Sequence, residues 1–142
     1  MNKNNIVVDT NVFISSALKS EGNPSKIMDL ITSGRVQLYY SKEIFEEYKR
    51  VLAYKKLKIS IESQNSLLKE IKKHGILVCP SPNISKNISF ARDESDRIFY
   101  DTALSSQSML ITGNAKHYPN SSFIVTPAEY INARITINNQ LL

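Results

Sequence analysis

The chain has 142 residues, 42% of them hydrophobic and 22% charged, which is enough for one domain with a core but not for two. Its apolar runs are too short for a membrane span or a signal peptide, and its single cysteine, Cys79, excludes an internal disulfide and a thiolate zinc cluster. The net charge of +5 favours polyanionic partners such as nucleic acid. From the length, the single cysteine and the short apolar runs we expect one cytoplasmic domain over residues 1–142 that makes no use of a membrane.

Short apolar runs alternate with longer amphipathic stretches along the chain. The short runs predict buried strands at residues 6–8, 36–40, 76–78, 109–111 and 123–125. The amphipathic stretches predict helices at about residues 11–19, 24–33, 41–54, 60–73 and 95–107. Strands separated by helices imply an α/β fold, a three-layer α/β/α sandwich with a central, mainly parallel sheet.

Local signals mark where these elements begin and end. Pro24 and Ser41 suit helix starts, and Gly34 and Gly75 each follow a helical stretch as a terminating C′ glycine would. The Pro-, Ser- and Asn-rich segment 79–94 predicts a loop. The last dozen residues predict a short helix followed by a frayed or strand-like end.

Polar residues follow the predicted strands, at the edge where open α/β sheets bind ligands. The four glycines form neither a G-x-G-x-x-G nor a P-loop pattern, which argues against dinucleotide binding and Walker-type ATP hydrolysis. The polar residues at this edge are Asp9-Thr10-Asn11, Ser41, Cys79-Pro80, Thr112-Gly113-Asn114 and Thr126.

Asp9 directly follows the first strand, so its carboxylate is expected at the ligand-binding edge of the sheet. The alternative is a structural role, because Asp is a favoured helix N-cap. Asn11 is able to cap the same helix.

Glu47 lies on a helix whose apolar stripe includes Ile44, Phe45 and Tyr48. At 100° per residue it falls about 90° from the centre of that stripe, where its carboxylate is able to reach over the sheet edge. An ordinary charge flanking the core is the alternative.

Asp96 occupies an equivalent position, about 85° from the centre of the buried face of its own helix. The alternative for Asp93 and Asp96 is a weak capping box at the helix start. Asp101 points away from the core in this projection and is expected to be exposed to solvent.

Asp9, Glu47 and Asp96 therefore converge at one end of the sheet, with Asp93 nearby. Carboxylates gathered without matching cations repel one another, and a divalent metal relieves that repulsion. Oxygen-only ligands suit Mg²⁺ or Mn²⁺, which activate water and stabilise the oxygens of a phosphodiester.

The sequence contains the segments IVVDTNVFISS, FEEYKRVL, RDESDRIFYDTAL and LITGNAKHYP. They occur in the order and spacing of PIN-domain proteins, which the chain resembles from about residue 6 to residue 130. The family consists of metal-dependent ribonucleases, many of them toxins of bacterial toxin–antitoxin pairs. The resemblance implies a three-layer fold with about five parallel strands, RNA as substrate, an antitoxin protein as partner and a homodimer.

The resemblance assigns metal binding to Asp9, Glu47 and Asp96, and matches Asp93 to an additional acid. Members often carry a fourth acid after the last active-site strand, where this chain has Asn114 and His117. We therefore expect one firmly held Mg²⁺ or Mn²⁺ and a second only with substrate phosphate. Asn11, Thr112 and Asn114 match or neighbour small polar positions that support the site.

The basic residues after Glu47 are expected to guide an RNA backbone toward the acids: Lys49, Arg50, Lys55, Lys56 and Lys58. Tyr54 lies among them, whereas Tyr48 is on the core stripe. A solvated pair of helices explains the same charges.

The remaining titratable residues have simpler interpretations. His117 suits a loop residue that packs locally, and His74 a favourable charge at a helix end. Cys79, in an apolar setting before Pro80, is expected to be inert.

Three readings of the function compete with a nuclease. A PIN-like module that binds RNA or protein without cutting is the strongest of them, because the fourth acid is missing. A phosphoacceptor receiver domain requires an Asp and a Lys after strands that end here in Cys79-Pro80 and Thr126-Pro127. A D-x-D phosphatase is disfavoured because Asn11 replaces the second Asp.

Overall fold

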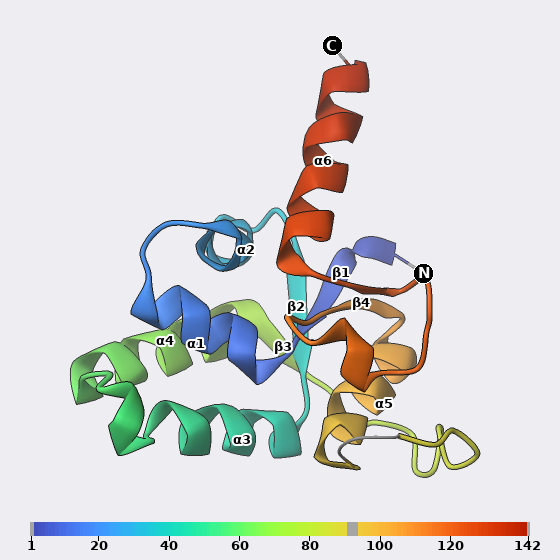
Figure 1. The fold of residues 1–142 in the computed structure, drawn as a ribbon, viewed down its shortest axis with the longest axis horizontal. Helices are drawn as coiled ribbons and strands as arrows, with labels where there is room; N and C mark the ends of the chain where they lie inside the picture. Colours follow the sequence, from blue (N-terminus) through green and yellow to red (C-terminus); the bar gives the residue numbers. More distant parts are fainter. Residues whose placement is uncertain (1, 91–93, 142) are drawn as a thin grey trace.

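The computed structural model describes residues 2–90 and 94–141, the last five by their backbone alone. It centres on a sheet with strand order β3-β2-β1-β4-β5 (Figure 1). Every strand pairing is parallel, which confirms the predicted parallel α/β sheet. The strands are β1 (Asn2–Val8), β2 (Gln37–Tyr40), β3 (Gly75–Leu77), β4 (Ser108–Ile111) and β5 (Ile124–Val125).

Helices lie between the strands at the predicted positions. Three short 3-10 helices, η1 (Lys55–Leu57), η2 (Glu94–Asp96) and η3 (Ala115–His117), complete the connections. None of the described helices is long and apolar enough to cross a membrane. The α-helices are α1 (Thr10–Leu18), α2 (Asn23–Thr32), α3 (Lys42–Leu52), α4 (Ile61–His74), α5 (Arg97–Ser106) and α6 (Pro127–Leu141).

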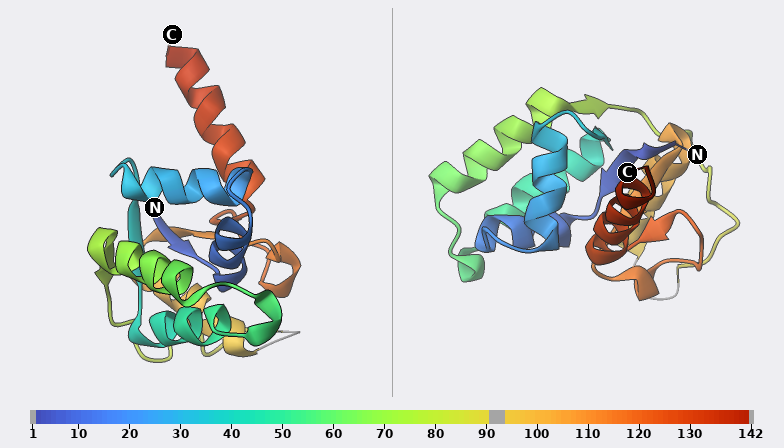
Figure 2. Two further views of the ribbon diagram at one scale, coloured as in Figure 1. Left: turned by 90° about the vertical axis from the view of Figure 1, so that its left-hand side faces the viewer. Right: turned by 90° about the horizontal axis from the view of Figure 1, so that it is seen from above.

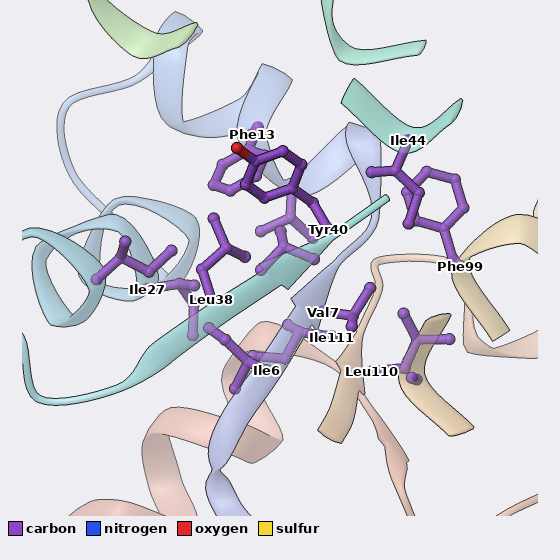
Figure 3. Close-up of a cluster of buried hydrophobic side chains, with 14 of the residues drawn as sticks. Ile6, Val7, Phe13, Ile27, Leu38, Tyr40, Ile44, Phe99, Leu110 and Ile111 are labelled. Atoms are coloured by element: carbon purple, nitrogen blue, oxygen red, sulfur yellow. The ribbon is translucent and has the colours of Figure 1, made fainter. Parts of the chain in front are cut away.

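The helices cover both faces of the sheet, which confirms the three-layer architecture (Figures 1 and 2). Successive side chains of a strand point to opposite faces. Val7 of β1 pairs with Leu110 of β4 on the face covered by α5 and its Phe99, whereas Ile6 pairs with Leu38 of β2 on the face of α1 and α2 (Figure 3). All five side chains are completely buried, so the core fixes both helix layers against the strands.

The strand order reverses between β1 and β4. The chain builds β1, β2 and β3 outward in one direction, and then returns to the other side of β1 to add β4 and β5. Such a topological switch point leaves a crevice at the carboxyl ends of the two central strands. The Asp9 amide donates to the Ile111 carbonyl at 2.9 Å, so the residues that follow β1 and β4 lie side by side there.

Most of the predicted helix boundaries are confirmed. Ser41 Oγ accepts from the Ile44 amide at 3.2 Å and caps α3, and Pro24 lies in the first turn of α2. Gly34 follows α2 with a φ of 76°, the left-handed conformation of a C′ glycine. The predicted loop holds over residues 79–90, whereas its last predicted residue, Glu94, begins the 3-10 helix η2.

Gly75 ends α4 for a different reason from the one predicted. Its φ of −89° and ψ of 159° are extended, so no left-handed turn requires glycine. A Cβ at this position would lie 2.6 Å from the Ile71 carbonyl oxygen and 2.7 Å from the Tyr40 ring. Glycine is present because the backbone approaches these groups closely where α4 passes into β3.

The predicted strand-like end is wrong, because α6 continues as a helix from Pro127 to Leu141. A capping box starts it: the Thr126 amide donates to Glu129 Oε1 at 3.0 Å, and the Glu129 amide donates to Thr126 Oγ1 at 3.1 Å. The Tyr130 hydroxyl donates to the Lys3 carbonyl at 2.6 Å and ties the first turns of α6 to β1. Beyond these turns the helix projects from the body of the protein (Figure 1).

Candidate active site at the carboxyl edge of the sheet

Asp9 lies at the switch point and is 7% exposed. Its Oδ2 accepts hydrogen bonds from Thr112 Oγ1 at 2.7 Å and from the Tyr118 hydroxyl at 3.1 Å. Although Asp9 precedes α1, its side chain makes no capping hydrogen bond. The capping interpretation is therefore wrong, and the carboxylate is directed toward the crevice between β1 and β4.

The surroundings of Asp9 oppose its ionisation only in part. Burial raises the pKa of the Asp9 carboxyl, while hydrogen bonds from Thr112, Tyr118 and the Thr10 backbone, together with the charge of His117, act to lower it. The net shift is upward. A buried carboxylate of this kind is stabilised further by a nearby cation.

Glu47 reaches the same edge from α3. Its Oε2 accepts a hydrogen bond from the Thr10 hydroxyl, and its Oε1 lies 3.6 Å from Arg50 Nη2. The Glu47 side chain is 16% exposed, as its position at the boundary of the apolar stripe predicts. Thr10 follows Asp9 directly, so this hydrogen bond brings Glu47 to the element that carries Asp9.

Asp96 approaches from the start of α5. It occupies the N-cap position of α5, where its side chain makes no capping hydrogen bond. The capping box predicted for Asp93 and Asp96 lies partly outside the described residues. Its Oδ2 lies 3.5 Å from His117 Nδ1, and its side chain is 16% exposed. His117 therefore contacts a candidate catalytic acid. The sequence predicted only a loop residue that packs locally.

Tyr118 lies within electrostatic reach of all three acids. Burial raises the pKa of its hydroxyl strongly, and the negative charges of Asp9, Asp96 and Glu47 raise it further. The pKa of the fully buried Tyr48 is raised by burial and by Asp9 and Glu47. The only sequence signal for Tyr118 is its place in the K-H-Y-P segment after the last active-site strand, which did not predict a role in the site.

The predicted supporting residues hold the backbone around Asp9. Thr112 is completely buried, and its hydroxyl also accepts from the Asn114 amide at 3.0 Å. Asn11 Oδ1 accepts from the Gly113 amide at 3.4 Å. Asn114 contacts Thr112 through its backbone amide, and the residue is exposed to solvent.

Asp93 lies outside the described residues, so the structure places only three of the four predicted acids. Within residues 2–90 and 94–141, no three or more His, Cys, Asp and Glu side chains form a group able to hold a metal ion. The donor chemistry of Asp9, Glu47 and Asp96 nevertheless fits Mg²⁺ or Mn²⁺, because these ions use one or two carboxylates and complete their coordination with water and phosphate.

The predicted RNA-binding cations lie along the end of α3 and on η1. Lys49 is 3.9 Å from Glu46, and Arg50 donates to the Tyr54 hydroxyl at 2.5 Å. Lys55 is exposed, and the Lys56 ammonium lies 6.0 Å from the centre of the Tyr54 ring.

Two predictions outside the acidic site need correction. Cys79 is exposed rather than enclosed in an apolar setting. Asp101 is half-buried and accepts a hydrogen bond from the hydroxyl of the buried Ser85, whereas the helical projection predicted an exposed side chain. His74 lies 3.1 Å from Glu70 Oε2 at the end of α4.

The comparisons with known proteins agree with this fold. A family model described as PIN domain matches residues 5–116, so the chain belongs to the PIN-domain family, whose members are generally nucleases. The chain is also 34% identical over 110 residues to an uncharacterized protein of Methanocaldococcus jannaschii. The aligned region covers 77% of this chain and 70% of that protein.

Proposed function

We propose that the protein is a metal-dependent endoribonuclease that hydrolyses phosphodiester bonds of RNA. The observation that supports the proposal is that Asp9, Glu47 and Asp96, from three separate elements, all act electrostatically on Tyr118, whose hydroxyl donates to Asp9 at the switch point. These acids would hold Mg²⁺ or Mn²⁺ and act as the catalytic residues, with Asp93 as an additional ligand. The site would thus serve the nuclease activity typical of the family.

The bound ion would supply positive charge to the phosphate and lower the pKa of a water molecule. The protein's own residues fix the acids: Thr112 and Tyr118 donate to Asp9, and Thr10 donates to Glu47. In the reaction, a water oxygen forms a bond to phosphorus and the bond from phosphorus to the 3′ oxygen breaks. The 3′ oxygen takes a proton, and the phosphate stays on the 5′ end of the downstream product.

The basic residues near the acids support RNA as the polymer. Lys and Arg side chains bind phosphates independently of sequence and steer a polyanion toward a site. The residues proposed for this role are Lys49, Arg50, Lys55 and Lys56.

We further propose that the protein is the toxin of a toxin–antitoxin pair and acts in the cytoplasm. The four segments that resemble PIN toxins support this role. A cognate antitoxin protein would then block the acidic site or withdraw one of its ligands. A homodimer formed through helices is part of the same proposal, as is a single PIN-like domain over residues 1–142.

The alternative function is a catalytically weak or inactive PIN-like module that binds RNA or protein. One observation favours it: Asn114 and His117 stand where many members carry the fourth acid. Neither side chain brings a negative charge at neutral pH.

Cleavage of a mixed pool of tRNA and structured RNA distinguishes the two functions. Wild type, Asp9→Asn and the control Glu46→Gln would be compared in Mg²⁺, Mn²⁺ and EDTA. Glu46 is exposed and lies 3.9 Å from Lys49, so its variant should cut as wild type does. Cleavage that requires metal and disappears in Asp9→Asn supports the nuclease, whereas cleavage that persists in Asp9→Asn contradicts the assigned site.

If the wild type does not cut, Asn114→Asp would be tested in the same way. Metal-dependent cleavage by this variant would show that the missing acid disables the natural protein. The binding module would then be the better description.

A further inference from the structure

Tyr54 differs from every other aromatic residue of the chain in its exposure. The chain has seven tyrosines, five phenylalanines and no tryptophan, and all twelve lie within the described residues. Tyr54 is 39% exposed, while the others are buried or half-buried. The hydrophobic core does not account for an aromatic residue at this position.

Two cations hold the Tyr54 ring in place. Arg50 donates to its hydroxyl at 2.5 Å, with the guanidinium 6.0 Å from the ring centre, and the Lys56 ammonium is also 6.0 Å from that centre. The ring is thus oriented by its neighbours without being covered by the core.

The surroundings of Tyr54 are strongly basic. Between Tyr48 and Ile61 the sequence contains five Lys and Arg residues and no acidic residue. Such a segment attracts a phosphate backbone. An exposed aromatic ring among phosphate-binding cations is the arrangement that single-strand binders use to stack bases.

Arg50 connects this ring to the candidate active site. It contacts Tyr54 with one nitrogen and lies 3.6 Å from Glu47 Oε1 with another. Glu47 lies five residues before the end of α3 at Leu52, and Tyr54 follows that end by two residues. Toward its C-terminal end α3 extends away from the sheet (Figure 1), so an RNA strand bound at the acids is able to continue over this basic segment.

We propose that Tyr54 is a base-stacking residue that makes the protein prefer single-stranded to double-stranded RNA. This inference rests on the proposed function, because it places RNA at the acidic site. In a duplex the faces of the bases are covered by their neighbours, so an aromatic side chain has no open base on which to stack. Lys56 and Arg50 bind phosphates on either kind of RNA.

Binding to a labelled 12-nucleotide RNA, alone and paired with its complement, tests the proposal by fluorescence anisotropy in EDTA. Without metal no cleavage consumes the probe. Tyr54→Leu should weaken single-strand binding roughly 5- to 100-fold and leave duplex binding within about twofold. Lys55→Gln, at an exposed position, is the matched control, and it should weaken both kinds of binding alike because it removes a phosphate contact.

Tyr54→Trp adds a direct readout, because the natural chain has no tryptophan. Stacking on a base should quench its fluorescence with single-stranded RNA and much less with duplex. Ile135→Trp, at a 49% exposed position on α6 beside Arg134, is the control, and RNA should not quench it. Equal quenching of both tryptophans, or equal loss of single-strand and duplex binding in Tyr54→Leu, would overturn the proposal.

The outcome is separable from that of the proposed function. Single-strand binding that depends on Tyr54, in a protein that never cuts RNA, would contradict the nuclease and support the stacking residue. Metal-dependent cleavage with unchanged RNA binding by Tyr54→Leu would have the opposite meaning. An absence of all RNA binding by the wild type would contradict both.

Discussion

Asp9 is held in a position that disfavours its own charge. Burial raises its pKa even though Thr112, Tyr118 and the Thr10 backbone all donate to it. Groups with perturbed pKa values gather at functional sites, and such sites often cost a protein some of its stability. A cation bound beside Asp9 would offset the free energy that this buried charge costs in the metal-free protein.

Replacing Asp9 with asparagine should therefore stabilise the metal-free protein. The neutral amide has the same shape, and its oxygen is able to accept from Thr112 and Tyr118. In EDTA at pH 7 we expect Asp9→Asn to raise Tm by about 2–5 °C. Thermal unfolding measured by circular dichroism tests this, and a lower Tm would show that the donors outweigh the burial of the charge.

Thr112 is the donor whose loss should be most costly. Its buried hydroxyl donates to Asp9 and accepts from the Asn114 amide. Thr112→Val keeps the shape but leaves both groups without this partner, so it should lower the free energy of unfolding by about 1–3 kcal/mol. Thr112→Ser keeps the hydroxyl and should lose less; equal losses in the two variants, measured in urea, would point to the methyl group instead.

At the scale of elements, Arg97 of α5 binds the loop that precedes this helix. Its guanidinium donates to the carbonyls of Ser85 at 2.6 Å and Ile88 at 2.8 Å, and to Glu94 Oε2 at 2.7 Å. It also stacks 4.5 Å from the centre of the Phe90 ring. Arg97 follows Asp96 directly, so the same contacts fix the start of the helix that presents this acid.

We expect Arg97→Gln to loosen that loop and leave the sheet intact. Backbone amides of residues 85–90 should exchange with solvent roughly tenfold faster, while those of β1 and β4 stay protected. Hydrogen-exchange mass spectrometry measures both regions. Lys86→Gln, at an exposed neighbouring position, is the control; similar exchange in the two variants would contradict the role given to Arg97.

The capping box of α6 should make stability depend on pH. Hydrogen bonds from Thr126 lower the pKa of Glu129, so the folded state favours the ionised carboxylate. This contribution is complete above the unfolded pKa of about 4.3 and is lost as pH falls through the lower, folded value. Because Glu129 is exposed, Glu129→Ala should destabilise by less than about 1 kcal/mol at pH 7.

Urea unfolding of wild type and Glu129→Ala at pH 7 and pH 3 checks this dependence. The difference between the two proteins should shrink at the lower pH. A difference that grows as pH falls would mean that the carboxylate does not stabilise α6.

For the molecule as a whole, the sequence predicted the elements that depend on local periodicity. The five short apolar runs became the strands, and the helical projection placed Glu47 at the boundary of a buried face, where the structure has it. Asp9 followed from its place after the first strand. These predictions succeeded because each depends only on residues a few positions apart.

Features set by distant contacts were missed. Tyr118 lies far along the chain from Asp9, and no local pattern indicates their hydrogen bond. Asp101 was predicted to be exposed because a helical projection does not include the loop that carries Ser85. Gly75 was assigned to the correct boundary for the wrong reason, since the close approach of the Tyr40 ring depends on strand pairing.

The central claim is that Asp9, Glu47 and Asp96 together bind a divalent cation. Calorimetric titration of Mn²⁺ into the RNA-free protein tests it most directly, with Asp9→Asn, Asp96→Asn and the control Glu46→Gln measured under the same conditions. We predict one firm site in the wild type and in Glu46→Gln, and its loss in both Asp variants. Mn²⁺ binding by Asp9→Asn with wild-type affinity would contradict the claim, and two tight sites in the wild type would contradict the single-metal arrangement.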